Sequence, residues 1–379
     1  MNQQTTSSFR DKLAKNGPRK LLACDGGGIR GIISIEILDR VERELRAASG
    51  NLNLVLADYF DYVAGTSTGA IIATLVALGF SMDEAREFYL KSGEEMFQPA
   101  KLWERLHTKF LDDNLTKMLK DIIGEKTTLA TDRLRTLLMI VLRNATTDSP
   151  WPISSNPLAK YNELAVRGDG SNLHLPLWQL VRASTAAPTY FPPEVIDVGP
   201  NRFIFVDGGV TMYNNPAFQL FLMATTEPYR LCWPTGEDRM LLISVGTGAS
   251  ANANKNLTPR EMNLIYNAGN IPSALMAAAL HEQDFLCRIF GKCLSGDPLD
   301  RELGDVIGKG IPGVAKLFTY VRYNAELSRE GLDSLGLPNI DPAHVQQLDA
   351  VEHIGKMQQV GQAVAAQKVK AEHFASFPV

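Results

Sequence analysis

The first clear hydrophobic pattern along the chain is a short apolar run, followed by apolar residues at helical spacing. The segment 20–24 is almost wholly apolar and ends in Asp25 and three glycines. After the glycines, the segment 32–48 carries apolar residues every three or four positions, which places them on one face of a helix. This order predicts a strand, a glycine-rich loop and a helix.

A second unit of the same kind follows. Apolar residues at 59–64 lead into the string GTSTG at 65–69, and the segment 70–78 that comes next is made of small and apolar residues suited to a buried helix. Two successive strand–loop–helix units predict a parallel sheet with right-handed crossovers. The pattern therefore indicates an α/β fold.

The middle of the chain is predicted to contain helices, strands and loops. Ser81 and Glu84 have the spacing of a capping box, which predicts a helix over 82–93. We expect the charged, helical stretch that continues to residue 147 to lie across the top or side of the sheet. Three further strands are predicted at 137–143, 203–206 and 239–245, and the proline-containing segments 150–158 and 184–193 predict loops.

The last third of the chain is predicted to be mainly helical. One helix is expected over 271–290, with Pro272 in its first turn. Asp341 and Pro342 form an N-cap and first helical residue, and the helix that follows is expected to extend as far as His373.

Composition narrows the class of protein. The chain has 379 residues, of which 45% are hydrophobic and 21% charged, so it can bury a large core and is expected to form one globular domain. The net charge of -4 argues against a general DNA or RNA partner, which would favour a basic surplus. No run reaches the 18 or so apolar residues of a membrane span.

The spacing of the cysteines and the composition of the N-terminal segment favour a cytoplasmic location. The four cysteines are scattered, lack metal-ligand spacing and fit a reducing cytoplasm, and no secretory signal is recognised. The first 20 residues hold five basic side chains against Asp11, so residues 1–19 are expected to form a flexible, solvated segment. Contact of this segment with anionic lipid is the alternative.

GTSTG offers a serine on a sharp turn. Gly65 and Gly69 leave room for a tight strand-to-helix turn, and the helix that follows points its positive end at Ser67. A serine becomes a nucleophile only when a base takes its proton and the turn exposes its oxygen. The string also occurs in proteins where it has no catalytic role, so its position between strand and helix is what favours catalysis.

DGGGIRG, from Asp25 to Gly31, allows two interpretations. It satisfies G-x-G-x-x-G, yet no acidic residue closes the second strand, as a dinucleotide site requires, and no Lys-Ser/Thr pair follows, as in a P-loop. The backbone N–H groups of Gly27 and Gly28 are instead expected to form an oxyanion hole. Asp25 is expected to fix the loop by accepting backbone N–H bonds, and Arg30 is either an exposed helix charge or a source of positive potential.

Asp207 is the candidate base. It ends an apolar strand and is followed by Gly208 and Gly209, which let the backbone pass close to another loop. A DGG string is usually only a turn, and it gains a catalytic meaning when it is paired with Ser67. His281 follows Asp207 in the order of a Ser–Asp–His triad, so an α/β-hydrolase-type esterase remains an alternative.

These strings together resemble a family. The glycine loop, the serine elbow and the D-G-G aspartate are similar, in this order, to those of bacterial patatin-like phospholipases, as is STAAPTYFPP at 184–193. The resemblance implies a three-layer sandwich with a mainly parallel sheet, a catalytic domain at 20–250 and a mainly helical region at 251–379. It implies a Ser67–Asp207 dyad, an oxyanion hole at Gly27 and Gly28, and no metal or cofactor. The motif residues that support these roles are Asp25, Gly26, Arg30, Gly31, Gly65, Gly69, Gly208 and Gly209.

The resemblance also suggests a substrate and a way in which the activity is regulated. A phospholipid membrane surface is the expected substrate, and Ile29, Tyr190 and Phe191 are candidates for an acyl channel. The segments 319–327 and 331–337 resemble the tail of antiphage effector phospholipases, which implies activation by a cyclic GMP-AMP-type dinucleotide, action on the inner membrane from the cytoplasm, and a homodimer as an option. The alternative from another class is a catalytically silent lipid-binding or storage protein.

Overall fold

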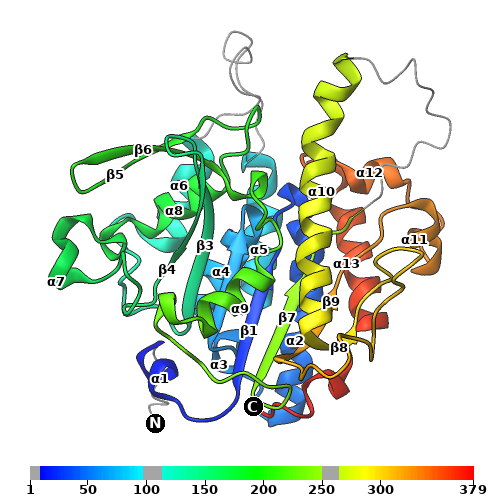
Figure 1. The fold of residues 1–379 in the computed structure, drawn as a ribbon. Coiled ribbons are helices and arrows are strands. Elements are labelled where there is room, and N and C mark those ends of the chain that lie inside the picture. The colour runs from blue at the N-terminus through cyan, green and yellow to red at the C-terminus, as the bar shows by residue number, and fades with distance from the viewer. Residues whose placement is uncertain (1–8, 97–112, 250–263) are drawn as a thin grey trace.

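The computed structural model describes residues 9–96, 113–249 and 264–379 (Figure 1). A nine-stranded sheet runs through its centre. The strands are β1 (Arg19–Cys24), β2 (Tyr62–Thr66), β3 (Leu137–Asn144), β4 (Ser149–Ser154), β5 (Glu194–Val198), β6 (Asn201–Asp207), β7 (Met240–Val245), β8 (Gly291–Ser295) and β9 (Phe318–Tyr323).

Helices cover both faces of this sheet. The helices are α1 (Phe9–Ala14), α2 (Gly31–Ser49), α3 (Leu56–Tyr59), α4 (Thr68–Ala77), α5 (Met82–Met96), α6 (Asp113–Ile123), α7 (Leu164–Arg167), α8 (Leu177–Ser184), α9 (Ala217–Thr225), α10 (Leu264–Phe290), α11 (Arg329–Ser334), α12 (Pro342–Gln346) and α13 (Ile354–Lys368). In Figure 1, α9 and α10 lie in front of the sheet, and α2, α4 and α13 lie behind it. The predicted α/β fold is confirmed as three layers.

The sheet is mostly parallel. Its path is β5-β6-β3-β2-β1-β7-β9-β8, with β4 paired to β3 off this path. Along the part of this path that runs β3-β2-β1-β7-β9-β8, every neighbouring pair is parallel. The pairs formed by β4, β5 and β6 are antiparallel. Every residue of β1, β2, β7 and β9 is buried, as expected for strands covered on both faces.

The predicted elements around the motifs are confirmed with small shifts. Strand β1, helix α2 and helix α4 match their predictions, and Ser81 and Glu84 do form a capping box, with Ser81 N–H 2.8 Å from Glu84 Oε2 and Glu84 N–H 3.3 Å from Ser81 Oγ. The second strand begins later than expected, because Leu56–Tyr59 forms the short helix α3.

The predicted loop at 150–158 is wrong, because residues Ser149–Ser154 form strand β4 against β3. Pro150 pairs with Arg143 and Pro152 with Val141. The two prolines occupy alternate positions, so both missing N–H groups face the same side, away from the partner strand. A strand at an edge tolerates proline in this arrangement.

The C-terminal helices also differ from expectation. Helix α10 already includes Leu264, so Pro272 lies inside it and not in its first turn. Asp341 caps Ala343 N–H at 2.9 Å as predicted, but α12 ends at Gln346. Residues 347–350 are not helical. A short 3-10 helix, Val351–His353, leads into α13, and another, Ala371–Phe374, follows it.

Two strands of the C-terminal third extend the central sheet. Strand β9 pairs in parallel with β7, and β8 pairs in parallel with β9. The segment 319–327, singled out above for its resemblance to effector tails, therefore contributes a buried strand to the sheet.

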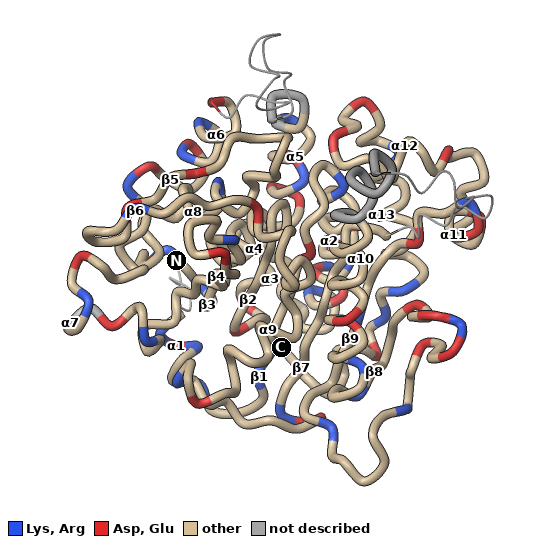
Figure 2. Tube along the Cα trace, turned by 45° about the horizontal axis from the view of Figure 1, so that its top comes forward, with Lys and Arg blue, Asp and Glu red and all other residues tan. Residues whose placement is uncertain are grey.

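The N-terminal segment is not free over residues 9–19, which corrects the expectation of a flexible start; residues 1–8 lie outside the described part. Phe9 is buried in helix α1. Lys15 pairs with buried Asp61 at 3.2 Å, and Lys12 Nζ donates to Asp58 O at 3.0 Å. Elsewhere acidic and basic positions are interleaved along the chain (Figure 2). No helix among the described residues is long and apolar enough to cross a bilayer.

Candidate active site

Ser67 stands at the turn between β2 and α4. Its φ of 54° is unusual for a residue with a side chain and is typical of a strained nucleophile elbow. A β-carbon on Gly65 would lie 2.0 Å from Gly69 O, and one on Gly69 would lie 2.2 Å from Cys24 O. Both motif glycines are therefore required for close packing of the elbow on itself and on β1.

Ser67 and Asp207 are brought together by strand β3. Thr66 pairs with Val141 and Asp207 with Leu142, the next residue of β3. Because β4 pairs with residues 139–144 of β3 on one edge, β2 and β6 share the other edge. The two strands thus meet end to end, with the serine and the aspartate at their tips.

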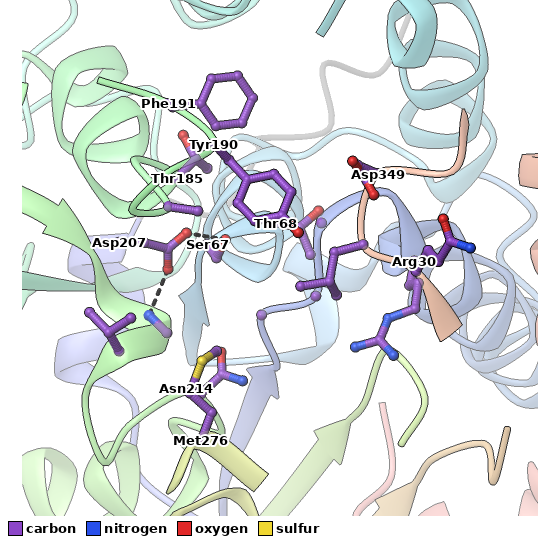
Figure 3. Close-up of a pocket in the computed structure, with 18 of the residues that line it drawn as sticks. Arg30, Ser67, Thr68, Thr185, Tyr190, Phe191, Asp207, Asn214, Met276 and Asp349 are labelled. Atoms are coloured by element: carbon purple, nitrogen blue, oxygen red, sulfur yellow. Dashed lines mark hydrogen bonds between the residues drawn. The ribbon is translucent and has the colours of Figure 1, made fainter. Parts of the chain in front are cut away.

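The two side chains are hydrogen-bonded directly. Ser67 Oγ donates to Asp207 Oδ2 at 2.6 Å, and Gly209 N–H donates to Asp207 Oδ1 at 2.6 Å (Figure 3). The second bond fixes the carboxylate plane, so one oxygen stays directed at the serine.

The segment 184–193 supports both residues, a role that sequence reasoning missed. Ser184 Oγ accepts the N–H of Ser67 at 2.9 Å and donates to Val141 O at 2.7 Å. Asp207 N–H donates to Ala186 O at 2.9 Å. The amide of the nucleophile is therefore occupied, and donors for an oxyanion must come from elsewhere.

The glycine loop offers such donors. Gly27 and Gly28 line the same pocket as Ser67, and within the described residues their backbone N–H groups have no hydrogen-bond acceptor. The loop is fixed on both sides of them, because Gly26 N–H donates to Asn214 O at 3.1 Å and Ile29 N–H donates to Leu348 O at 2.9 Å.

The glycine loop also touches the elbow. A β-carbon on Gly26 would lie 3.1 Å from Ser67 Cβ, and one on Gly31 would lie 2.6 Å from Thr68 Oγ1. This close approach explains why the loop carries glycine at both positions.

Asp25 does not have the role expected of it. Its carboxylate forms a buried ion pair with Arg322 of β9, at 2.9 Å and 2.5 Å, and not the expected bonds to backbone N–H groups. Arg30 is half-buried and lines the pocket, and its Nη1 donates to Gln346 O at 3.3 Å. Burial lowers the pKa of Arg30 to about 10, so it remains charged at neutral pH.

The pocket around these residues has a volume of about 940 Å³ and is lined largely by apolar side chains. Tyr190 and Phe191 line it, as the acyl-channel prediction expected (Figure 3). Ile29, the third candidate, is fully buried and does not line it. Residues from α4, α6 and α10 complete the apolar wall: Ile71, Leu115, Met276 and Leu280.

Histidine is not part of this arrangement in the described residues. His281 is exposed on α10 and does not line the pocket. Across the described ranges, no group of three or more His, Cys, Asp or Glu side chains is placed to hold a metal ion.

Burial changes the acidity of Asp207. Loss of hydration raises the pKa of this carboxyl to about 6, although the hydrogen bonds from Ser67 and Gly209 oppose the rise. A carboxylate with a pKa near neutrality is a stronger base than an exposed aspartate, yet it is still mostly ionised at pH 7.

The fold and the site together define a class: a three-layer α/β protein whose elbow serine is bonded to an aspartate beside a glycine loop. Residues 22–221 match the family described as patatin-like phospholipase. The chain belongs to this family.

Two patatins from Solanum agree with this assignment. The chain is 29% identical over 258 residues to Patatin-17 of Solanum cardiophyllum and 28% identical over 258 residues to Patatin-T5 of Solanum tuberosum. Each match covers 64% of this chain and 63% of the relative. Among solved structures, VipD from Legionella pneumophila is similar with a TM-score of 0.36 and 13% identity, over 93% of this chain and 67% of that chain.

Proposed function

We propose that the protein is a lipid acyl hydrolase of the phospholipase A type, which cleaves carboxylic ester bonds of membrane phospholipids. The observation that carries the proposal is the 2.6 Å hydrogen bond between Ser67 Oγ and Asp207 Oδ2 in an apolar pocket. Family membership supports the same reaction class.

The reaction follows from this geometry. Asp207 takes the proton of Ser67 as the serine oxygen attacks the ester carbonyl carbon, and the N–H groups of Gly27 and Gly28 stabilise the oxyanion that forms. The tetrahedral intermediate breaks its bond to the alcohol oxygen, and Asp207 returns the proton to the departing alcohol. Water then attacks the acyl-serine, with Asp207 as base again; the bond from the acyl carbon to Ser67 Oγ breaks, the fatty acid is released, and Asp207 returns the proton to Ser67.

The pocket supports a lipid substrate. Its apolar wall suits an acyl chain, and Arg30 supplies a positive charge on the same pocket for a lipid phosphate. Asp349 also lines this pocket (Figure 3), but no ion pair joins it or another carboxylate to Arg30 among the described residues.

The rate is expected to rise with pH and to level off above a midpoint of about 6. Below that pH, Asp207 is protonated because its pKa is raised to about 6, and it cannot take the serine proton. A profile of kcat/KM against pH from 4.5 to 8.5, on a soluble ester, checks this. A midpoint near 4, or a rate that falls as pH rises through 6, contradicts the assignment of Asp207 as base.

Product analysis tests the function itself. Purified protein is incubated with phosphatidylcholine vesicles, and the lipids are analysed by mass spectrometry for free fatty acid and lysophospholipid. Both products are expected from the wild type and neither from Ser67→Ala. Lipid binding without products would favour the silent lipid-binding or storage protein.

We also propose the finer role that the tail suggests: activation by a cyclic dinucleotide in antiviral defence. Its support is the resemblance of 319–327 and 331–337 to effector tails. Residues Phe318–Tyr323 are buried in β9, so a nucleotide would have to bind other residues. The vesicle assay is repeated with a panel of cyclic dinucleotides, including cyclic GMP-AMP. Stimulation is expected, and full activity without nucleotide, together with no binding by calorimetry, would contradict this role.

A further inference from the structure

The glycine loop is attached to a part of the chain beyond the matched residues 22–221. Asp25, the first residue of the DGGG string, makes a two-pronged ion pair with Arg322 on β9. Asp25 is 2% exposed and Arg322 is 5% exposed. A paired, planar contact of this kind fixes orientation as well as distance.

The strand register explains how Arg322 reaches Asp25. Arg322 pairs with Ser244 of β7, and Ser244 pairs with Ala23 of β1. Ala23 and Asp25 are two positions apart and face the same side of the sheet. Small side chains at Ser244 and Ala23 leave a path for the guanidinium over β7, and Arg322 Nη1 also donates to Ser244 Oγ at 2.6 Å.

The contact lies at the start of the segment that carries the oxyanion donors. The N–H groups of Gly27 and Gly28 have no acceptor in the described protein, so their direction depends on how the rest of the loop is held. A buried ion pair contributes little net stability compared with apolar residues of the same volume. Stability alone therefore does not account for it at this position.

We infer that Arg322 is a positioning residue for the reaction: through Asp25 it fixes the glycine loop so that the Gly27 and Gly28 amides point at the oxyanion. The inference rests on the proposed function. It assigns a functional residue of this site to strand β9, far along the chain from the glycine loop, the serine elbow and Asp207.

The test uses the double variant Asp25→Asn/Arg322→Met, because either single loss would leave a buried, unpaired charge. Once folding has been verified by circular dichroism, kcat is expected to fall about 10²-fold, since a small displacement of a catalytic group costs about this much. KM and the pH midpoint are expected to stay near their wild-type values, because the Ser67–Asp207 bond is untouched. Arg322→Lys, which keeps the charge, is expected to retain more activity than the double variant.

A matched control separates positioning from general loss of stability. Glu42 and Arg46 form another ion pair with a buried carboxylate, on α2 and outside the pocket lining. Glu42→Gln/Arg46→Met is expected to leave kcat per folded molecule unchanged, whatever its effect on the melting temperature. If both double variants lose kcat equally, or if Asp25→Asn/Arg322→Met keeps it, the inference is overturned.

Hydrogen exchange gives a readout that does not depend on activity. The amides of Asp25, Gly26 and Ile29 are hydrogen-bonded to Val245, Asn214 and Leu348. Their protection is expected to fall in Asp25→Asn/Arg322→Met and to stay unchanged in the Glu42/Arg46 control. Unchanged protection in the first variant overturns the inference even if the wild type hydrolyses lipid. An inactive wild type with the expected exchange result would contradict the proposed function alone.

Discussion

Asp207→Asn is expected to reduce kcat for ester hydrolysis by about 10⁴-fold and to leave the fold intact, because general-base assistance contributes about 10²–10⁴. Asparagine has nearly the same shape, so its side-chain oxygen still accepts the N–H of Gly209, which Asp207 Oδ1 accepts at 2.6 Å. What it lacks is the negative charge that takes the proton of Ser67. Steady-state kinetics on a soluble ester and on phospholipid vesicles measure the loss.

His281→Ala is the control for this variant. His281 is exposed and lies outside the pocket lining, so its removal is expected to leave kcat and KM within about twofold of the wild type. The reverse pattern, with Asp207→Asn active and His281→Ala inactive, would move the chain to the Ser–Asp–His class of esterases.

Gly27→Ala is expected to lower kcat by about 10²–10³-fold, the usual cost of one lost oxyanion donor. The cause is steric. Gly27 has a φ of 168°, which any residue adopts, but a β-carbon there would lie 2.0 Å from Thr247 Oγ1 and 2.5 Å from Thr247 Cβ. The loop must move away from Thr247, and its amides move with it.

Removing the obstacle tests that reason. In Gly27→Ala/Thr247→Gly the clash with the Thr247 side chain is gone, and part of the lost activity is expected to return. Thr247→Gly alone is the reference, because this substitution also removes the hydrogen bond from Thr247 to Gly26 O. Gly355→Ala, on α13 with no atom within 4 Å of the new β-carbon, is expected to behave as the wild type. A fully active Gly27→Ala, measured by kcat at saturating ester, would show that this loop does not hold the oxyanion.

Local patterns predicted the elements around the motifs well. The apolar run before Asp25 and the helical spacing after Gly31 identify β1 and α2 because both signals are short-range. The same holds for the capping box of Ser81 and Glu84. The errors lie where local chemistry misleads, as with Pro150 and Pro152, which occupy tolerated positions in an edge strand.

The pairing of strands that are distant along the chain could not be predicted from the sequence. The meeting of β2 and β6 on one edge of β3 places Ser67 beside Asp207, and no local pattern shows that β6 runs antiparallel. Strand β9 was missed because the segment reads as part of a helical tail. For the same reason Arg322 could not be recognised as the partner of Asp25.

Labelling with a fluorophosphonate tests the central claim, the activation of Ser67 by Asp207, most directly. The reagent reacts with activated serines, and peptide mass spectrometry locates the adduct. We predict one adduct per chain, on Ser67, which is absent in Ser67→Ala and at least 10²-fold slower to form in Asp207→Asn. An adduct on another serine, or an unchanged rate in Asp207→Asn, would contradict the account.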